Sequence, residues 1–492
     1  MEALPTEIYS VASVREFDRT AIEDEGIPGY TLMTRAGEAA VREALATYPD
    51  ARRWQIVCGA GNNAGDGYVV GRLAAREGIV VSVISLADPA SLHGDALTAY
   101  EDFAAEGGVA SPWSGILDTE ADLIVDAMLG SGLLRDVGGE FADCVAAINA
   151  HGAPVLAIDI PTGLGGDSGA VMGCAVHAEL TVTFVGLKSG LFLGEGPDYC
   201  GEIRFAGLDI PESCRSHCIP EFRRIDENRI TAALPRRART AHKGDFGHVL
   251  VVGGGVGMPG AVRLCGEAAL RTGAGLVSIA TDKSHAAMIT ASRPELMAHG
   301  VESVQDLEPL LERADVVAFG PGLGSSPWAQ DLASYLAEDA RPAVWDADAL
   351  NWLAEAPAEK SNRVITPHPG EAGRLLGTNA MEVQADRRKA LGRLQDTYGG
   401  AVVLKGAGSL VSAATGSPWL CTRGNPGMAA AGMGDVLTGI IAALIAQGLD
   451  PQEAAAIGVE IHARAGDAAA ASGERGILAS DLLACIRGIV NA

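Results

Sequence analysis

The sequence predicts an α/β protein with two doubly wound parallel sheets, and two observations carry this prediction. Short apolar runs rich in β-branched residues alternate with longer helical patterns along the 492 residues, which is typical of a parallel sheet with crossover helices. Nearly every apolar run also ends in a glycine-rich or acidic loop. In such sheets, loops at the carboxyl ends of the strands bind ligands.

Composition limits the kinds of partner. The chain has 48% hydrophobic and 20% charged residues, which is typical of a globular protein with a large core. A formal net charge of −25 and an aromatic content of 5% argue against nucleic acid and against a membrane surface. No signal peptide and no transmembrane run is expected. The nine cysteines form no CxxC pair, so we expect free thiols in a cytoplasmic protein.

The first half opens with two helices, expected over residues 10–25 and 31–48. A buried strand at residues 54–58 then runs into a glycine-rich loop, residues 59–67, and a helix follows to about Glu77. A strand, a glycine-rich loop and a helix in this order hold phosphates or a nucleotide at the edge of a parallel sheet.

That loop differs from the plain dinucleotide fingerprint because it carries Asn62, Asn63 and Asp66. Their oxygen atoms suit a hard cation or a ribose better than a bare pyrophosphate. An Asx-rich turn without a ligand is the structural alternative. The strand before the loop and the helix after it favour a ligand site.

Further strands are expected over residues 80–86, 123–126, 153–158 and 180–185, with a helix over 95–106 and an edge strand over 201–206. Two of these strands meet acids at their carboxyl ends, Asp126 and Asp159, and Thr162 follows closely. A second glycine loop spans residues 127–133. An isolated acid there is more often a helix cap, but three polar positions beside glycine loops favour a site.

The composition of the sequence changes between Pro211 and about Arg239. This stretch is rich in cysteine, arginine and proline and lacks a periodic apolar pattern. We therefore predict two domains, residues 1–216 and 222–492. The second half again alternates strands with loops, and the strands are expected over residues 249–252, 276–280, 315–319, 343–346, 364–366 and 401–405.

Near its end, the second half contains a glycine-rich turn, residues 425–435, whose last residue is Asp435. An apolar run that predicts a helix follows this turn. A helix N-terminus with free N–H groups binds anions, so Asp435 is either a helix cap or a base. The polar loops at the other strand ends favour the base. Lys405 and its loop would hold a nucleotide phosphate. His368 lies between two prolines at a strand end, which favours a cleft position over a surface or core role.

The second half resembles the ribokinase-like superfamily and, within it, the ADP- or ATP-dependent NAD(P)H-hydrate dehydratases. The motifs that carry this resemblance are residues 243–247, 320–324, 346–350, 366–371, 405–408 and 425–439. The first half resembles the NAD(P)H-hydrate epimerase domain, a Rossmann-like fold, through residues 26–28, 32–33, 59–67, 126–133 and 159–163. The fusion of the two is the pattern of the bifunctional bacterial repair enzymes.

The resemblance implies a chemistry. Nicotinamide cofactors that have become hydrated on the ring exist as two epimers, which the first domain would interconvert. The second domain would phosphorylate the ring hydroxyl of one epimer and release phosphate, which restores NADH or NADPH. The implied cofactors are ADP, with ATP as the alternative, together with Mg²⁺ and K⁺. A homo-oligomer is also implied.

The resemblance further implies three sets of site residues. The K⁺ ligands would be Asn63, Asp126 and Thr162. The hydrated cofactor would contact Asn62, Asn63, Ala64, Gly65, Asp66, Gly130, Ser131, Gly132, Leu133, Leu134, Arg135, Asp136 and the acid/base Asp159 in the first domain, and Ala261, Gly322, His368 and the catalytic base Asp435 in the second. The nucleotide would contact Lys405, Gly406, Ala407, Gly408, Ser409 and Gly434.

Two positions depart from the epimerase pattern. Ala64 stands where a glycine is usual, and Thr34 stands where an acid is common, which makes epimerase activity less secure than dehydratase activity. A rival interpretation makes the second domain a small-molecule kinase that stops at a phosphorylated product. In that interpretation the first domain is a non-catalytic binding or oligomerisation module.

Overall fold

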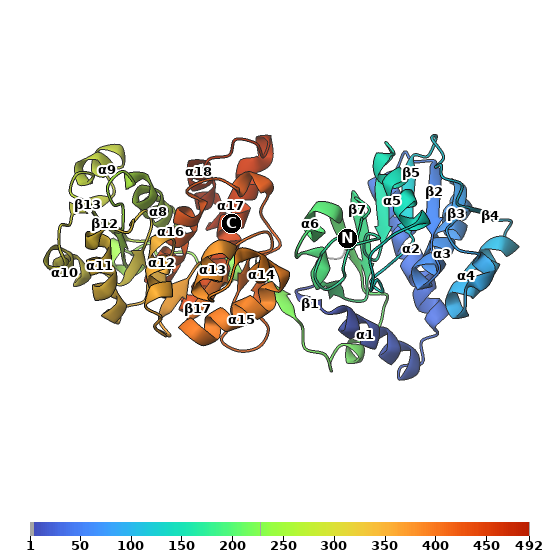
Figure 1. The fold of residues 1–492 in the computed structure, drawn as a ribbon, viewed down its shortest axis with the longest axis horizontal. Coiled ribbons are helices and arrows are strands. Elements are labelled where there is room, and N and C mark those ends of the chain that lie inside the picture. Colours follow the sequence, from blue (N-terminus) through green and yellow to red (C-terminus); the bar gives the residue numbers. More distant parts are fainter. Residues whose placement is uncertain (1–3, 227, 492) are drawn as a thin grey trace. The chain divides into compact units, whose positions relative to one another are not determined.

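A computed structural model describes residues 4–226 and 228–491. The chain divides into two compact units, Met1–Arg223 and Arg224–Ala492 (Figure 1). Each unit has its own hydrophobic core. Parallel sheets dominate both units, as the sequence predicts. In the described part of the chain no helix combines the length and the apolar character needed to cross a membrane. Each of the nine cysteines is a free thiol.

The first unit is built on a seven-stranded sheet in the order β4-β3-β2-β5-β6-β7-β9. Every neighbouring pair in it is parallel. The chain leaves β2 toward one edge and returns at β5 to build the other, so the topological switch point lies between β2 and β5. The strands are β2 Arg53–Cys58, β3 Val80–Ser85, β4 Ala110–Pro112, β5 Leu123–Ala127, β6 Val155–Ile158, β7 Leu180–Phe184 and β9 Glu202–Ala206.

Side-chain alternation along β2 shows why both faces of this sheet are covered. Ile56 and Cys58 point into one apolar cluster with helices α2 to α4. Val57, between them, packs in a second cluster with α5. A strand buried on both faces reads as a continuous apolar run, as β2 does. The main helices are α1 Val11–Glu23, α2 Gly29–Thr47, α3 Asn62–Arg76, α4 Gly94–Ala105 and α5 Glu140–Ala150.

The predicted loop 59–67 is shorter than expected, because α3 already begins at Asn62. Only residues 59–61 connect β2 to the helix, and Asp66 therefore lies on the second turn of α3. Gly59 must be glycine, since a Cβ atom there would lie 2.0 Å from the carbonyl oxygen of Met128. This close approach joins the end of β2 to the loop after β5.

A short three-stranded ladder outside the seven-stranded sheet completes the first unit. β1, Glu7–Tyr9, pairs with β10, Phe222–Arg224, and with β8, Leu187–Lys188. This ladder holds the start of α1 beside the segment that follows β7. It therefore positions residues that come from opposite ends of the first unit.

The second unit contains parallel strands in the order β13-β12-β11-β14-β15-β16-β17. Two short antiparallel strands, β18 Leu410–Val411 and β19 Trp419–Leu420, extend it beyond β17. The switch point lies between β11 and β14. The parallel strands are β11 His248–Val252, β12 Leu276–Thr281, β13 Met297–Gly300, β14 Val316–Phe319, β15 Ala343–Trp345, β16 Arg363–Ile365 and β17 Ala401–Leu404.

Helix α16, Met433–Ala446, is the most buried helix of the second unit and lies in its core beside α8, Pro259–Thr272. The two helices touch closely at Gly439, where a Cβ atom would lie 2.0 Å from the carbonyl oxygen of Cys265. The other helices are α7 Asn228–Ala233, α9 Ala286–Ser292, α10 Val304–Leu311, α11 Pro327–Glu338, α12 Asp348–Glu355, α13 Pro369–Leu375, α14 Ala380–Ala385, α15 Arg387–Tyr398, α17 Pro451–Ala469 and α18 Ala479–Ile489. This tight packing fixes the N-terminus of α16.

Candidate active sites

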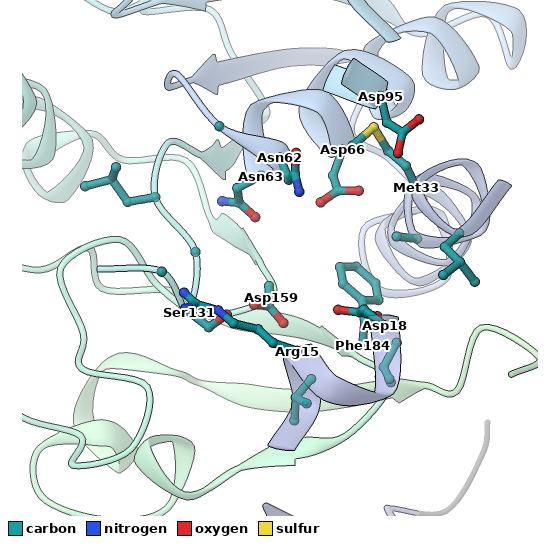
Figure 2. Close-up of a pocket in the computed structure, with 18 of the residues that line it drawn as sticks. Arg15, Asp18, Met33, Asn62, Asn63, Asp66, Asp95, Ser131, Asp159 and Phe184 are labelled. Atoms are coloured by element: carbon teal, nitrogen blue, oxygen red, sulfur yellow. The ribbon is translucent and has the colours of Figure 1, made fainter. Parts of the chain in front are cut away.

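A cavity of about 660 Å³ opens in the first unit at the carboxyl ends of its strands. Figure 2 shows the carboxyl groups of Asp18, Asp66 and Asp159 turned toward the same space. Ten predicted substrate residues line the cavity, and they come from α3, from the loop after β5 and from the end of β6: Asn62, Asn63, Asp66, Gly130, Ser131, Gly132, Leu133, Leu134, Arg135 and Asp159. The predicted loops thus meet at one place.

Three of the predicted substrate residues lie outside the lining of this cavity. Ala64 is fully buried in α3. Gly65 packs against α2, since a Cβ atom on it would lie 2.7 Å from the sulfur of Met33. Asp136 is exposed beyond the rim. The helical start of α3 explains the first two, because successive helical residues point in different directions.

Asp159 follows β6 directly and has a positive φ of 67°. It forms an ion pair with Lys188, whose side chain is 1% exposed. The Lys188 ammonium also donates to Thr183 Oγ1 at 3.0 Å and to the carbonyl oxygen of Phe184 at 3.1 Å. All of these partners hold Lys188 on the cavity floor, beside the Asp159 carboxylate.

Asp66 and Asp18 lie on opposite walls of the cavity and have no comparable cation. Burial raises the pKa of Asp66 well above its usual range, and the negative charges of Asp159 and Asp18 add to the shift. Burial likewise raises the pKa of Asp18 to about 6, with Lys188 opposing the shift. An acid paired with a lysine, Asp159, therefore faces two acids whose pKa values are raised, an arrangement that can serve acid/base chemistry.

The three predicted K⁺ ligands also come together. Thr162 donates from its hydroxyl to Asp126 Oδ1 at 2.7 Å and from its N–H to Oδ2 at 2.8 Å. Asp126 is fully buried, and burial raises its pKa to about 6. Asn63 reaches the same region from α3, beside Gly130, and its buried amide nitrogen has no hydrogen-bond partner.

This set fits a potassium ion. Among the described residues no lysine or arginine neutralises Asp126, and a buried carboxylate without a cation is costly. A hydroxyl, an amide and a carboxylate supply the oxygen ligands that such a cation prefers. Gly130 leaves room beside the Asn63 amide, since a Cβ atom there would lie 3.3 Å from its oxygen.

In the second unit, a buried ion pair marks the predicted site. Lys405, directly after β17, donates to Asp346 Oδ1 at 2.7 Å, and Thr438 of α16 donates to Oδ2 at 3.0 Å. Burial alone would raise the pKa of Asp346, but the Lys405 ammonium outweighs it and lowers the pKa. Gly434 lies over this pair, because a Cβ atom there would be 3.1 Å from the Asp346 carboxylate.

Asp435 lies in the first turn of α16, and it is not the N-cap of this helix. The N-cap of α16 is Gly432, in the left-handed region with φ 89°, and Asp435 is the third helical residue. Burial raises the pKa of Asp435 to about 7, and the neighbouring charge of Asp346 adds to this shift. Lys405 is committed to Asp346, so Asp435 is poised to exchange a proton near neutral pH.

The remaining predicted contacts of the second unit fall in two places. Gly322, with φ 54°, packs against Ala261 of α8, where a Cβ atom would lie 3.0 Å from the Ala261 Cβ. His368 caps α13, and its Nδ1 accepts from the N–H of Gly370 at 3.0 Å. Its side chain is 57% exposed. Because Nδ1 serves the cap, Nε2 carries the ring hydrogen of the neutral side chain, and it lies 3.5 Å from Glu371 Oε1.

Comparison with known proteins identifies the family of each half of the chain. A family model described as YjeF-related protein N-terminus matches residues 29–190, and one described as NAD(P)H-hydrate dehydratase matches residues 249–487. The bifunctional NAD(P)H-hydrate repair enzyme Nnr of Coxiella burnetii is 47% identical over 99% of this chain and 100% of its own length. The Escherichia coli enzyme of the same name is 42% identical over 99% of this chain and 95% of its own length. The chain belongs to this repair-enzyme family.

A solved structure supports the fold of the second unit. A ribokinase-like superfamily protein from Enterococcus faecalis is 29% identical, with a TM-score of 0.51, and covers 55% of this chain and 96% of its own. The ribokinase-like prediction for the second half is therefore confirmed, as is the resemblance of the whole chain to the bifunctional repair-enzyme family.

Several cavity residues escaped the sequence reasoning. Arg15 and Asp18 come from α1, which precedes the residues matched by the first family model. Lys188 comes from β8, and Asp95 from α4. A weak signal existed for Asp18, because it lies next to Phe17 on a helix with an apolar face. An acid beside such a face is a candidate for a buried role.

Proposed function

We propose that this member of the repair-enzyme family restores hydrated NADH and NADPH with two active sites. Residues 1–216 would epimerise the two hydrates, and residues 222–492 would dehydrate one of them at the expense of ADP or ATP. The observation that carries the proposal is the pairing of Lys405 with Asp346, which leaves Asp435 unpaired with its pKa raised to about 7 at the N-terminus of α16.

Dehydration would begin when Asp435 takes the proton of the ring hydroxyl. The hydroxyl oxygen then attacks the terminal phosphoryl group of the nucleotide, whose leaving oxygen departs with the shorter nucleotide. The phosphorylated ring carbon next loses phosphate, and loss of a ring proton restores the double bond. Lys405, Gly434 and the N–H groups after β17 would bind the phosphates, as a helix N-terminus and a glycine loop do.

Epimerisation would use Asp159 as base and a protonated carboxyl group as acid. The hydrated ring carbon carries a hydroxyl group and the ring nitrogen. If Asp159 removes the hydroxyl proton and an acid gives one to the nitrogen, the C–N bond opens to an aldehyde. Closure on the other face with the proton transfers reversed gives the second epimer. Asp66 faces Asp159 and holds a proton readily, so it supplies the acid.

K⁺ would be held by Asn63, Asp126 and Thr162, and it would supply a positive charge near the phosphates of the hydrated cofactor. Mg²⁺ would enter with the nucleotide as part of that substrate, since it needs few protein ligands. Assembly into a homo-oligomer is a further expectation, testable by light scattering.

The test is a recovery assay on the purified chain. An epimeric mixture of hydrated NADH is incubated with Mg²⁺, K⁺ and either ADP or ATP, and the absorbance of the dihydronicotinamide ring is followed. We expect recovery of all the substrate, beyond a control for spontaneous epimerisation. Recovery that stalls at the fraction of one epimer would refute the epimerase assignment. No recovery with either nucleotide would refute the dehydratase assignment and favour a small-molecule kinase.

A further inference from the structure

Arg387, the first residue of α15, lies directly behind the loop that follows β17. Its side chain donates to three backbone carbonyl oxygens there: Ala407, Leu404 at 3.1 Å and Lys405 at 3.3 Å. The residue is 6% exposed. One planar guanidinium thus holds carbonyls from the end of β17 and from both ends of the first loop turn, a geometry that its fixed fork of donors permits.

With these bonds, the carbonyl groups of the loop are bonded within the protein, whereas three of its N–H groups have no acceptor in the described chain. A fourth carbonyl oxygen, that of Gly406, accepts from the Ser409 hydroxyl at 3.0 Å. The carbonyl groups of residues 404–407 are therefore all occupied within the protein. Among the residues that the structure describes, none accepts a hydrogen bond from the N–H groups of Gly406, Ala407 and Gly408. Consecutive free N–H groups in a glycine turn form a concave anion site.

The charge of Arg387 is also uncompensated. All of its hydrogen-bond acceptors in the described chain are neutral carbonyl oxygens, and its Nε has no partner. Burial lowers the pKa of Arg387 to about 10. Its position at a helix N-terminus adds repulsion from the helix dipole. A buried cation without an anion is costly, and an anion bound on the far side of the loop would offset that cost.

We propose that Arg387 is a positioning residue for the nucleotide: it turns the loop after β17 so that three N–H groups face the phosphates, and its charge stabilises those phosphates through the loop. Gly406 is fitted to this arrangement. Its φ is 141°, and a Cβ atom there would lie 3.2 Å from the Arg387 guanidinium. Arg387 touches no substrate itself, so its effect is on nucleotide binding. The inference rests on the proposed nucleotide-dependent function of this site.

A matched control exists in the same unit. Arg363 is 2% exposed, and it also donates only to backbone carbonyl oxygens in the described chain, those of Ala358 and Tyr398. Burial lowers its pKa to about 10 as well. It lies at the start of β16, whereas the nucleotide loop follows the end of β17. Loss of either arginine removes a buried cation and its bonds, but only Arg387 contacts the loop.

The experiment compares Arg387→Lys, Arg387→Met and Arg363→Lys in the full chain. Nucleotide affinity is measured by calorimetry, and KM and kcat are measured in the recovery assay. For Arg387→Met we expect nucleotide affinity to fall about 10- to 100-fold, the value of bonds to a charged group, with Arg387→Lys in between. The KM should rise by a similar factor, with kcat nearly unchanged, because binding is lost equally in ground and transition states.

Arg363→Lys should lower the melting temperature as Arg387→Lys does and leave nucleotide affinity at the wild-type value. Wild-type affinity in both Arg387 variants would overturn the inference while leaving the proposed function intact. An equal loss of affinity in Arg363→Lys would also overturn it, since general destabilisation would then explain the effect. Failure of the wild-type chain to bind any nucleotide would overturn the proposed function and this inference together.

Discussion

The two proposed active sites share an acid–lysine pair at the end of a parallel strand. In the first unit, Lys188 pairs with Asp159 at the end of β6. In the second, Lys405 pairs with Asp346 at the end of β15. Beside each pair, burial raises the pKa of another acid on a nearby helix, Asp66 on α3 and Asp435 on α16. The acid of the pair adds to the shift, and the lysine opposes it. In both sites a buried ion pair thus lies beside a third acid whose pKa is raised mainly by burial.

The sites differ in the backbone that surrounds this pair. Beside the first pair, the buried carboxylate of Asp126 favours the proposed cation. Beside the second, Arg387 occupies the carbonyl oxygens and exposes N–H groups, which creates a need for an anion. We infer that the acid beside each acid–lysine pair exchanges protons with the substrate. The groups that the neighbouring loops present, carboxylate in the first site and N–H in the second, then decide whether a cation or an anion binds.

The largest effect should come from Asp435→Asn, which removes the proposed base of the second site. We expect the dehydration rate to fall about 10³- to 10⁴-fold, the upper range for general-base catalysis. Nucleotide affinity and epimerisation should be retained. The melting temperature of the variant shows whether it folds. Because burial raises the pKa of Asp435, the ionised carboxylate destabilises the wild-type fold, so Asp435→Asn should melt at a higher temperature than the wild type at about pH 8. A loss below about tenfold would contradict the assigned role.

Asp159→Asn makes the matching test in the first site. We expect epimerisation to fall about 10²- to 10³-fold, while dehydration of the acceptable epimer continues. The substitution leaves Lys188 as a buried cation without its partner, so the double variant with Lys188→Met is the control for folding. If Asp159→Asn epimerises at the wild-type rate and Asp66→Asn does not, the base is Asp66 and the comparison between the two sites fails.

The sequence predicted those parts of the sites that lie at strand ends. Asp126, Asp159 and Asp346 directly end apolar runs, and parallel strands necessarily share a carboxyl edge. The sequence could not pair them. Lys188 is 29 residues from Asp159 in the chain, and Lys405 is 59 residues from Asp346, so each ion pair depends on which strands become neighbours. Strand order is a tertiary property that local pattern does not encode.

Local competition explains the remaining differences in the fold. Asn and Gly favour turns, so residues 59–67 read as a loop, yet α3 starts at Asn62 because its apolar face packs on the sheet. Strands β18 and β19 have two residues each, too few for any periodicity. Asp435 resembled a helix cap because caps and first-turn acids lie within three residues of each other in the sequence. The left-handed backbone of Gly432 shows that the cap is Gly432.

A smaller effect is expected for the K⁺ dependence of epimerisation in the first site. Replacing K⁺ by a large organic cation should lower epimerisation about tenfold, and Thr162→Val should lose this response, as losses of metal-site groups typically do. Dehydration should not respond to Thr162→Val. Thr181→Val is the matched control, because Thr181 is equally buried and its hydroxyl donates to the carbonyl oxygen of Cys200 at 2.7 Å. An unchanged K⁺ response in Thr162→Val would contradict the proposed ligand.

The pH dependence of dehydration sharpens the electrostatics of the second site. Asp435 must be ionised to act, so kcat/KM should rise with pH through a midpoint of about 7. The charge of Asp348 contributes to this raised pKa, so Asp348→Asn should lower the midpoint and increase the rate at about pH 6 by roughly threefold. Asp331→Asn, an exposed acid on α11, is the control. A midpoint unmoved by Asp348→Asn would show that this neighbour does not tune the base.

The smallest effect should follow Ala64→Gly, which restores the residue usual in the epimerase pattern. Ala64 is a fully buried helical residue of α3, so its methyl group demands no unusual backbone. Glycine there should cost about 0.5–1 kcal/mol of stability through backbone entropy, plus the lost methyl packing, and the epimerisation rate should not change. Thermal unfolding and the recovery assay measure the two quantities. A faster epimerase would show instead that Ala64 restrains the segment carrying Asn63 and Asp66, and that the first site, unlike the second, is limited by its backbone.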